Sequence, residues 1–230
     1  MTLARFSFLG EDWTVIDTPG SVELAHLGHS ALQVADAAIV VADPDPERAM
    51  VVQPLLKRLD ELGLPHMIFV NRIETAEASV SAVLAALQEV SARPLVLRQI
   101  PIRDGEQVTG YVDLISERAY RYQPGQPSEL IQMPPAVQER EEADRQTLLE
   151  ALADFDDGLL EKLLEDVKPP KEEIYSYLEQ EFREDQVVPV LFGSSELDHG
   201  IQRLLKALRH DVPTAEVAAA RLSLPEEAPL

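Results

Sequence analysis

The sequence predicts an α/β fold, built on a mostly parallel sheet into which a smaller α+β subdomain is inserted. Three short apolar runs, at 37–42, 67–70 and 187–192, have the composition of strands that are buried on both faces. Helical patterns separate most of these runs, and such alternation favours parallel pairing. Between residues 94 and 185 the alternation stops, and several short strands are followed by two acidic helices. This change of order indicates the insert.

The elements expected before the insert follow from apolar spacing and from turn residues. Leu24, Leu27 and Ala31 recur at helical intervals. Gly63 is placed as the C-terminal cap of a later helix. The expected elements are strands at 5–9 and 13–16, a helix at 22–34, a strand at 37–42, a helix at 47–62, a strand at 67–70 and a helix at 76–89.

The remaining elements define the expected domain boundaries. They are strands at 95–101, 108–115 and 118–122, a turn rich in Pro and Gly, acidic helices at 135–167 and 171–184, a strand at 187–192 and a helix at 200–208. We therefore assign residues 1–93 and 186–212 to one α/β domain, and residues 94–185 to the inserted α+β subdomain. The tail at 213–230 is rich in Ala, Pro and Glu and is expected to be a linker.

Composition excludes several classes of function. The 230 residues contain no cysteine, which excludes disulfides, thiol catalysis and zinc–cysteine sites. No apolar run approaches the roughly 18 residues of a membrane span. The formal net charge of −21 opposes direct binding to a nucleic-acid backbone. We therefore expect a soluble, cytoplasmic, monomeric protein that binds neither DNA nor a membrane.

The negative charge is concentrated in one segment of the chain. Residues 129–186 hold 18 Asp and Glu against 6 Lys and Arg, a net charge of −12. One interpretation is a solvated outer face of the predicted helices. The other is a docking surface for a basic protein partner.

Three polar loops follow three of the predicted strands. They are DTPG at 17–20, NRIE at 71–74 and GSS at 193–195. In an open parallel sheet the loops at the carboxyl ends of the strands converge on one crevice. Each loop by itself has an ordinary structural explanation, a turn or a helix start. Their order, and the strand before each of them, point to a nucleotide site.

The residue types in these loops suit a guanine nucleotide. Asp17 would hold a magnesium ion through water, and the Gly20 N–H can approach a γ-phosphate closely because glycine has no Cβ. Asn71 and Glu74 would bind the base, since a carboxylate accepts from the two donors on the guanine edge. The Ser195 N–H could donate to the purine O6.

These motifs together resemble the G domain of translation elongation factor G and its close paralogues. DTPG corresponds to the third GTPase motif of that family, NRIE stands where the family has Asn-Lys-x-Asp, and GSSELDHG stands where it has Gly-Ser-Ala-Leu. The insert at 94–185 has the position of the family's extra subdomain, and TGYVDLISERAYRY at 109–122 resembles a stretch typical of it. The likeness extends over nearly the whole chain.

The resemblance implies a P-loop GTPase-type sheet and hydrolysis of GTP on the ribosome by the intact protein. It implies GTP or GDP and Mg²⁺ as ligands, and the ribosome with its stalk protein as partners. It also implies that the tail at 213–230 leads toward a second domain that is missing here. By correspondence of motifs, the nucleotide-binding residues are Asp17, Gly20, Asn71, Arg72, Glu74, Ser194 and Ser195.

The sequence departs from the family at important positions. It contains no G-x-x-x-x-G-K-[ST] phosphate loop, and the family's first strand and first switch precede the point that corresponds to Met1. The family's first strand lies between the strand at 13–16 and the strand at 37–42, so a gap of one strand, about 4.8 Å on either side, is expected there. As it stands, the chain is expected neither to bind GTP tightly nor to hydrolyse it.

Two motif residues also differ from the family. Ser21 occupies the position of the catalytic histidine and is too short to position a water molecule in the same way. Glu74 replaces Asp and is one methylene longer, and a bidentate contact tolerates such a shift poorly. Arg72 replaces Lys and could stack over the base. The alternative to a partial G domain is therefore a non-enzymatic, nucleotide-independent interaction module derived from such a GTPase.

Overall fold

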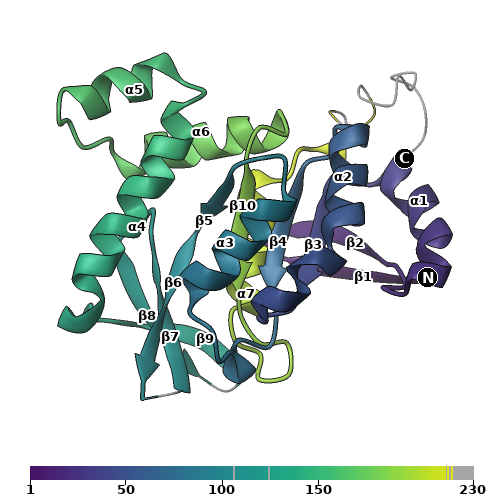
Figure 1. Cartoon of the computed structure of the whole chain (residues 1–230), viewed down its shortest axis with the longest axis horizontal. Coiled ribbons are helices and arrows are strands. Elements are labelled where there is room, and N and C mark those ends of the chain that lie inside the picture. The colour runs from purple at the N-terminus through teal and green to yellow at the C-terminus, as the bar shows by residue number, and fades with distance from the viewer. Residues whose placement is uncertain (106, 124, 216, 218, 220–230) are drawn as a thin grey trace.

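The computed structural model describes residues 1–230 except residues 106, 124, 216, 218 and 220–230, and it does not describe the side chains of residues 22, 25 and 27. The described residues form a four-stranded sheet with the order β3-β4-β10-β5, a second four-stranded sheet with the order β6-β7-β8-β9, and a two-stranded sheet of β1 and β2 (Figure 1). Most of the tail expected to be a linker lies outside the described residues.

The elements occur in an order close to the predicted one. The strands are β1 (Thr2–Phe8), β2 (Glu11–Asp17), β3 (Ala38–Ala42), β4 (His66–Val70), β5 (Leu95–Leu97), β6 (Gln99–Asp104), β7 (Gln107–Asp113), β8 (Arg118–Gln123), β9 (Gln126–Ile131) and β10 (Val188–Phe192). The α-helices are α1 (Ala25–Val34), α2 (Gln53–Leu62), α3 (Val80–Val90), α4 (Pro135–Ala153), α5 (Asp157–Leu164), α6 (Lys171–Arg183) and α7 (Ile201–Asp211). Short 3₁₀ helices occupy Val22–Leu24, Pro46–Val51 and Ile73–Thr75.

The first four-stranded sheet is parallel and buried between helices. Every residue of β4 and β10 is buried, as expected for strands covered on both faces. Ile68 and Val70 pack in the cluster that includes residues of α2 and α3, while Met67 and Phe69 pack with residues of α7. This alternation follows from the two-residue period of a strand, and it fixes the helices on opposite faces of the sheet.

The hairpin of β1 and β2 stands apart from the parallel sheet. Among the described residues the two strands pair only with each other, and β3 is the edge strand of its own sheet. Trp13 packs against the α7 side of the core, and Arg209 of α7 forms an ion pair with Glu11 at 3.2 Å. The expected break in the sheet between β2 and β3 is therefore observed, and the described chain does not close it. The prediction that residues 37–42 form a strand buried on both faces is wrong for one face, because Val40 is buried whereas Val41 is 61% exposed.

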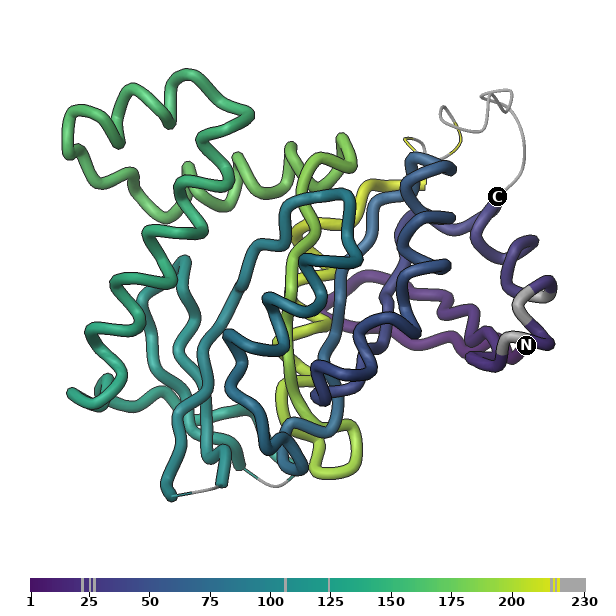
Figure 2. Tube along the Cα trace, in the orientation of Figure 1, coloured from purple at the N-terminus to yellow at the C-terminus, as the bar shows by residue number. Residues whose placement is uncertain are grey.

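The second four-stranded sheet is antiparallel and belongs to the insert, which the chain enters from β5 and leaves through α6 into β10 (Figure 2). The predicted strand at 95–101 is divided, because β5 pairs with β10 in the parallel sheet whereas β6 pairs with β7. The polypeptide thus changes sheets at Arg98. The division of the chain at residue 94 remains a proposal, and the pairing favours a boundary a few residues later.

The structure of the insert differs from the sequence prediction in two further places, one strand and one helix. Residues 126–131 form strand β9 where only a turn was expected, because pairing with β8 adds hydrogen bonds that the sequence pattern does not reveal. The predicted helix at 135–167 is interrupted. Asp156 caps a new helix there, and its Oδ1 accepts a hydrogen bond of 2.7 Å from the Leu159 N–H.

Capping residues also shift the predicted helix boundaries in the α/β part. The helix expected from residue 76 begins at Val80, since Ser79 is its N-cap and accepts a 3.1 Å hydrogen bond from the Ala82 N–H. Gly63 ends α2 in the left-handed conformation, φ 55°, as predicted. No helix in the described part of the chain has the length and apolarity needed to cross a bilayer.

A buried ion pair at the sheet change provides a test of the fold. Arg98 is fully buried, and its Nη1 lies 2.6 Å from Oδ2 of Asp211, the last residue of α7. We expect Asp211→Ala to lower the free energy of unfolding by about 3–5 kcal/mol, because it leaves a buried guanidinium without its counter-charge. Urea denaturation measures this change. As a control, Glu61→Ala removes the exposed 3.1 Å pair with Arg58 and should cost no more than about 0.5 kcal/mol. Equal losses in the two variants would contradict the prediction.

Candidate functional site

The carboxyl ends of β4 and β10 bring two of the predicted loops together. The strands pair in parallel, with Val70 opposite Phe192. Backbone hydrogen bonds then continue the pairing into the loops, from Gly193 N–H to the Val70 carbonyl at 3.0 Å and from Ile73 N–H to the Gly193 carbonyl at 3.1 Å. The NRIE and GSS segments are therefore held side by side.

Asn71 and Ser195 form a reciprocal contact between these loops. The Asn71 side-chain Nδ2 donates to Ser195 Oγ at 3.0 Å, and the Ser195 backbone N–H donates to Asn71 Oδ1 at 2.9 Å. The same N–H that was expected to donate to a purine O6 thus already donates to Asn71, and a bound base would share it. The contact spans 124 positions in the sequence, so it depends on the strand pairing.

Ser194 stabilises the loop from inside rather than facing a ligand. It is fully buried, its backbone exchanges two hydrogen bonds of 2.9 Å with His199, and its Oγ accepts from the Leu197 N–H at 3.1 Å. Glycine is required at position 193, because a Cβ there would lie 2.1 Å from the His199 carbonyl oxygen. The Gly-Ser-Ser sequence is thus explained by the tight packing of this turn.

Arg72 is anchored by a residue that the motifs did not single out. It adopts the left-handed conformation, with φ 58°, and its guanidinium forms an ion pair with Asp43, which follows β3. Arg48 lies 3.2 Å from the same carboxylate. Asp43 comes directly after the parallel strand β3, so the rule that identified the other loops could have identified it too.

His199 lies at the boundary between this site and the insert. Its ring stacks on Tyr122 of β8, with the ring centroids 4.2 Å apart and the planes 7° from parallel. Burial lowers the pKa of His199, while the nearby carboxylates of Glu74 and Asp198 oppose the shift. Glu74 is itself exposed. The insert therefore places the Tyr122 ring against His199, close to the loop that contains Glu74. The sequence did not reveal this contact.

The DTPG loop lies apart from the NRIE and GSS loops. Asp17 ends β2, and Asp17, Gly20 and Ser21 are all exposed. Figure 1 shows the end of β2 and the start of α1 at the right of the molecule, away from the lower ends of β4 and β10. The residues expected to bind the base are thus gathered, while those expected near the γ-phosphate and Mg²⁺ stand apart. The 230 residues contain no phosphate loop, so the phosphate side of a guanine-nucleotide site would lack its main contacts here.

Comparison with known proteins gives the family. The family model of the elongation factor Tu GTP-binding domain matches residues 2–214. The chain belongs to this GTP-binding family. The resemblance drawn from the DTPG, NRIE and GSS motifs is thereby confirmed, as is the α/β fold with its insert.

Individual relatives are similar over most of the chain. An elongation factor G-like protein of Synechocystis sp. is 44% identical over 209 residues, covering 91% of this chain and 31% of the relative. Elongation factor G of Thermotoga neapolitana is 31% identical over 203 residues, covering 87% of this chain and 29% of the relative. The crystal structure of ttk003000868 from Thermus thermophilus matches with a TM-score of 0.83 and 28% identity, over 92% of this chain and 32% of that one. The chain thus spans about a third of the length of these relatives.

The Asn71–Ser195 contact can be tested without a ligand. Asn71→Ala removes the acceptor of the Ser195 N–H, and we expect it to lower the free energy of unfolding by about 1–2 kcal/mol. The Ser195 amide should also exchange its hydrogen faster, as NMR would detect. Thr75→Ala is the matched control, because Thr75 Oγ1 donates to the Arg72 carbonyl at 2.9 Å and does not contact Ser195. Unchanged exchange at Ser195 in Asn71→Ala would show that the contact does not hold the loop.

Proposed function

We propose that this chain is part of the GTP-binding domain of an elongation factor G-like translational GTPase, and that it supplies the guanine-binding half of the nucleotide site. The observation that supports this most is the Asn71–Ser195 contact, because it brings the two expected base-binding loops together at the ends of adjacent strands. Asn71, Arg72, Glu74 and Ser195 would bind the base, with Ser194 holding the last loop in shape. The intact protein would couple GTP hydrolysis to work on the ribosome.

The phosphate and metal contacts in this proposal are incomplete. Asp17 would hold Mg²⁺ through a water molecule, and the Gly20 N–H would approach the γ-phosphate. A phosphate loop supplies most phosphate contacts in this class of site, and the 230 residues contain none. Ser21 has neither the reach nor the basicity to replace a histidine that orients the attacking water. The chain alone is therefore proposed to bind nucleotide weakly and not to hydrolyse it.

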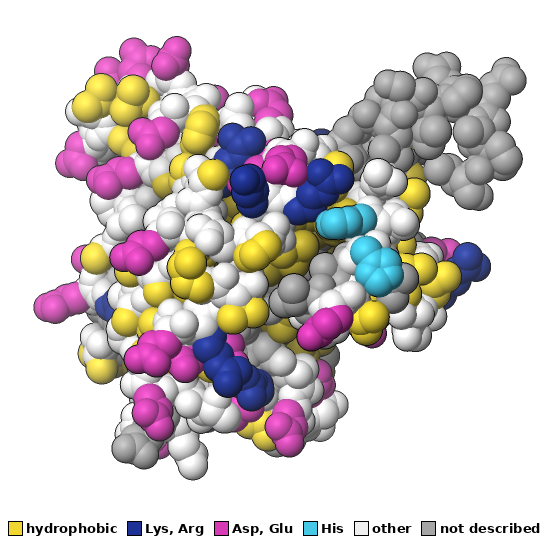
Figure 3. All heavy atoms as spheres, turned by 45° about the vertical axis from the view of Figure 1, so that its right-hand side comes forward, with side chains coloured by type: hydrophobic (Ala, Val, Ile, Leu, Met, Phe, Trp, Pro, Cys, Tyr) yellow, Lys and Arg dark blue, Asp and Glu magenta, His cyan; other side chains and the backbone are white. Residues whose placement is uncertain are grey.

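The acidic surface of the insert indicates what kind of partner the chain could bind. Figure 3 shows Asp and Glu side chains scattered over the visible face, with Lys and Arg in a few small groups. The segment of residues 129–186, with its net charge of −12, includes α4, α5 and α6 of the insert. Such a surface is suited to a basic protein rather than to nucleic acid. We propose that it faces the ribosomal stalk protein, in the cytoplasm, and that the chain is a monomer.

A second candidate function is a nucleotide-independent interaction module. Ser21 and Glu74 favour it, because both depart from the family within motifs that are otherwise present. In that case the Asn71–Ser195 contact would serve only to hold the two loops together.

Nucleotide titration separates the two functions. We expect millimolar GDP or guanosine to shift the NMR resonances of the Ser195 amide and the Asn71 side chain, and adenosine to leave them unchanged. Because the phosphate contacts are missing, GDP should bind no more tightly than about 1 mM, a free energy of about −4 kcal/mol. Guanosine and GDP should therefore have similar affinities.

The Asn71→Ala variant is the negative control, since it removes the proposed base contact. An absence of guanosine-induced shifts at these residues would favour the interaction module. Micromolar binding of GDP, competed by GTP and not by ATP, would show that the chain binds phosphates after all.

A further inference from the structure

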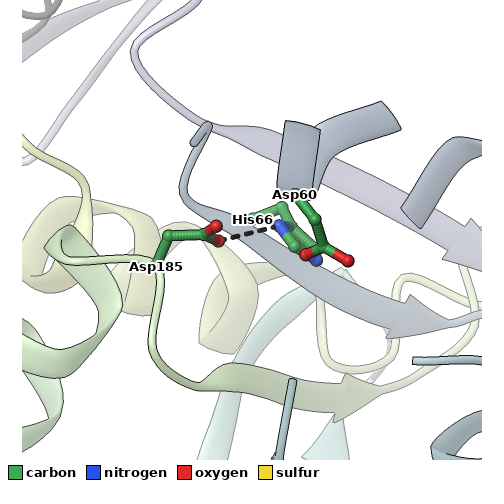
Figure 4. A group of neighbouring side chains, drawn as sticks. All are labelled: Asp60, His66 and Asp185. Carbon is green, nitrogen blue, oxygen red and sulfur yellow. Dashed lines mark ion pairs between the residues drawn. The ribbon is translucent and has the colours of Figure 1, made fainter. Parts of the chain in front are cut away.

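Three side chains capable of binding a metal ion meet at the end of β4 opposite to the nucleotide loops. Asp60 lies near the end of α2, His66 is the first residue of β4, and Asp185 lies between α6 and β10. One possible ligand atom from each lies within 4.8 Å of the other two. Figure 4 shows the His66 ring between the two carboxylates. The strand order brings these three elements together, although Asp60 and Asp185 are far apart in the sequence.

The histidine in this cluster is buried and incompletely bonded. His66 is 1% exposed, and its Nδ1 lies 3.1 Å from the Leu64 carbonyl oxygen and 3.4 Å from Asp185 Oδ1. The other ring nitrogen, Nε2, is buried and has no hydrogen-bond partner among the described residues. Within the same part of the chain, Asp60 Oδ1 and Asp185 Oδ1 are likewise buried without a hydrogen bond. The two carboxylate oxygens have only long ion-pair contacts, 3.4 Å from Asp185 Oδ1 to His66 Nδ1 and 3.7 Å from Asp60 Oδ1 to Arg93 Nε. Among the described residues, Nε2 is therefore the atom of this cluster that has no partner, and buried polar atoms usually have one.

The tautomer suggested by these contacts suits a metal ligand. If Nδ1 carries the proton and donates it to the Leu64 carbonyl, Nε2 presents a free lone pair. The Asp185 carboxylate, which lies against Nδ1, would then turn toward Nε2 to share a metal ion. A backbone carbonyl that orients the imidazole in this way is the common outer contact of a metal-binding histidine. One imidazole and two carboxylates are a donor set typical of Zn²⁺ and neighbouring first-row metals. Ligand atoms about 2.1 Å from a tetrahedral zinc ion are about 3.4 Å apart, so ligand atoms that now lie up to 4.8 Å apart would need to approach by up to about 1.4 Å.

Arg93 currently occupies the electrostatic role that a metal ion would take. Its guanidinium lies 3.2 Å from Asp185 and 3.7 Å from Asp60, and the side chain is 39% exposed. Burial raises the pKa of Asp60, as does Asp185, while His66 and Arg93 lower it. A divalent ion would neutralise both carboxylates more directly. Because Arg93 is partly exposed, its guanidinium could turn toward water when the ion binds.

We propose that Asp60, His66 and Asp185 form a binding site for a divalent transition metal of the zinc class, with water completing the coordination. The site would join α2, β4 and the connection between α6 and β10. It would hold the amino-terminal ends of β4 and β10 together, as the Asn71–Ser195 contact does at their carboxyl ends. The proposal does not depend on nucleotide binding.

The test uses the metal-free 230-residue chain and zinc chloride alone. Equilibrium dialysis should give one zinc ion per chain that is lost on substitution of His66. At zinc concentrations 100-fold above the dissociation constant, the melting temperature should rise by about 5–10 °C. His66→Gln and Asp60→Asn should each weaken binding at least about tenfold. Arg93→Gln should tighten it about threefold or more, because a competing positive charge is removed.

The exposed histidines of α1 provide the matched control. The double variant His26→Gln, His29→Gln removes two exposed imidazoles and should leave the zinc affinity unchanged. If His66→Gln fails to fold, Asp60→Asn and Arg93→Gln still decide the question, since a pure ion-pair network predicts no gain of zinc affinity in Arg93→Gln. Absence of stoichiometric zinc binding by the unsubstituted chain would overturn the proposal, and so would equal binding by the unsubstituted chain and Asp60→Asn.

Discussion

The parallel pairing of β4 with β10 is the contact on which the rest of the structure depends. Ile68 lies opposite Val190 and Val70 opposite Phe192, across about 120 residues of sequence. Closing so long a loop has an entropic cost that must be offset by the contacts it creates. Those contacts include two fully buried strands, the Asn71–Ser195 bonds at one end and the His66–Asp185 pair at the other. The register of one strand pair therefore positions both candidate sites.

Buried charges determine how the insert is attached to the parallel sheet. Arg98 pairs with Asp211, and Arg203 pairs with Asp113, each at 2.6 Å and almost entirely shielded from solvent. Burial alone would raise the pKa of Asp113, but the cations of Arg203 and Arg98, with hydrogen bonds from Ser116, lower it. Because ion pairs are directional, they orient β6 and β7 against α7 more strictly than apolar packing would. The Tyr122–His199 stack is a further contact between the insert and the segment that follows the GSS loop.

The candidate nucleotide site combines a preorganised part with an incomplete one. Asn71, Ser195, Arg72 and Asp43 satisfy one another without a ligand, and the loops that contain them keep a defined shape. The DTPG loop has no such support from its neighbours in the described sheets, since β2 does not pair with β3. Within the described residues β3 is the edge strand of its sheet, and Ile39 and Val41 are exposed on it. An apolar edge strand favours pairing with a further strand. The expected phosphate-side residues and the expected base-side residues thus lie on opposite sides of the break between β2 and β3.

The sequence by itself determined most of the strands and helices, the order of the three motifs and hence the family, because local apolar spacing, caps such as Gly63 and short motifs act within a few residues. It also revealed the departures at Ser21 and Glu74. Only the tertiary structure decided that β5 belongs to the parallel sheet, that residues 126–131 form a strand, and that Asp43 holds Arg72. It alone brought Asp60, His66 and Asp185 together. These features depend on register between distant strands, and no pattern of neighbouring residues encodes which distant partner a strand will find.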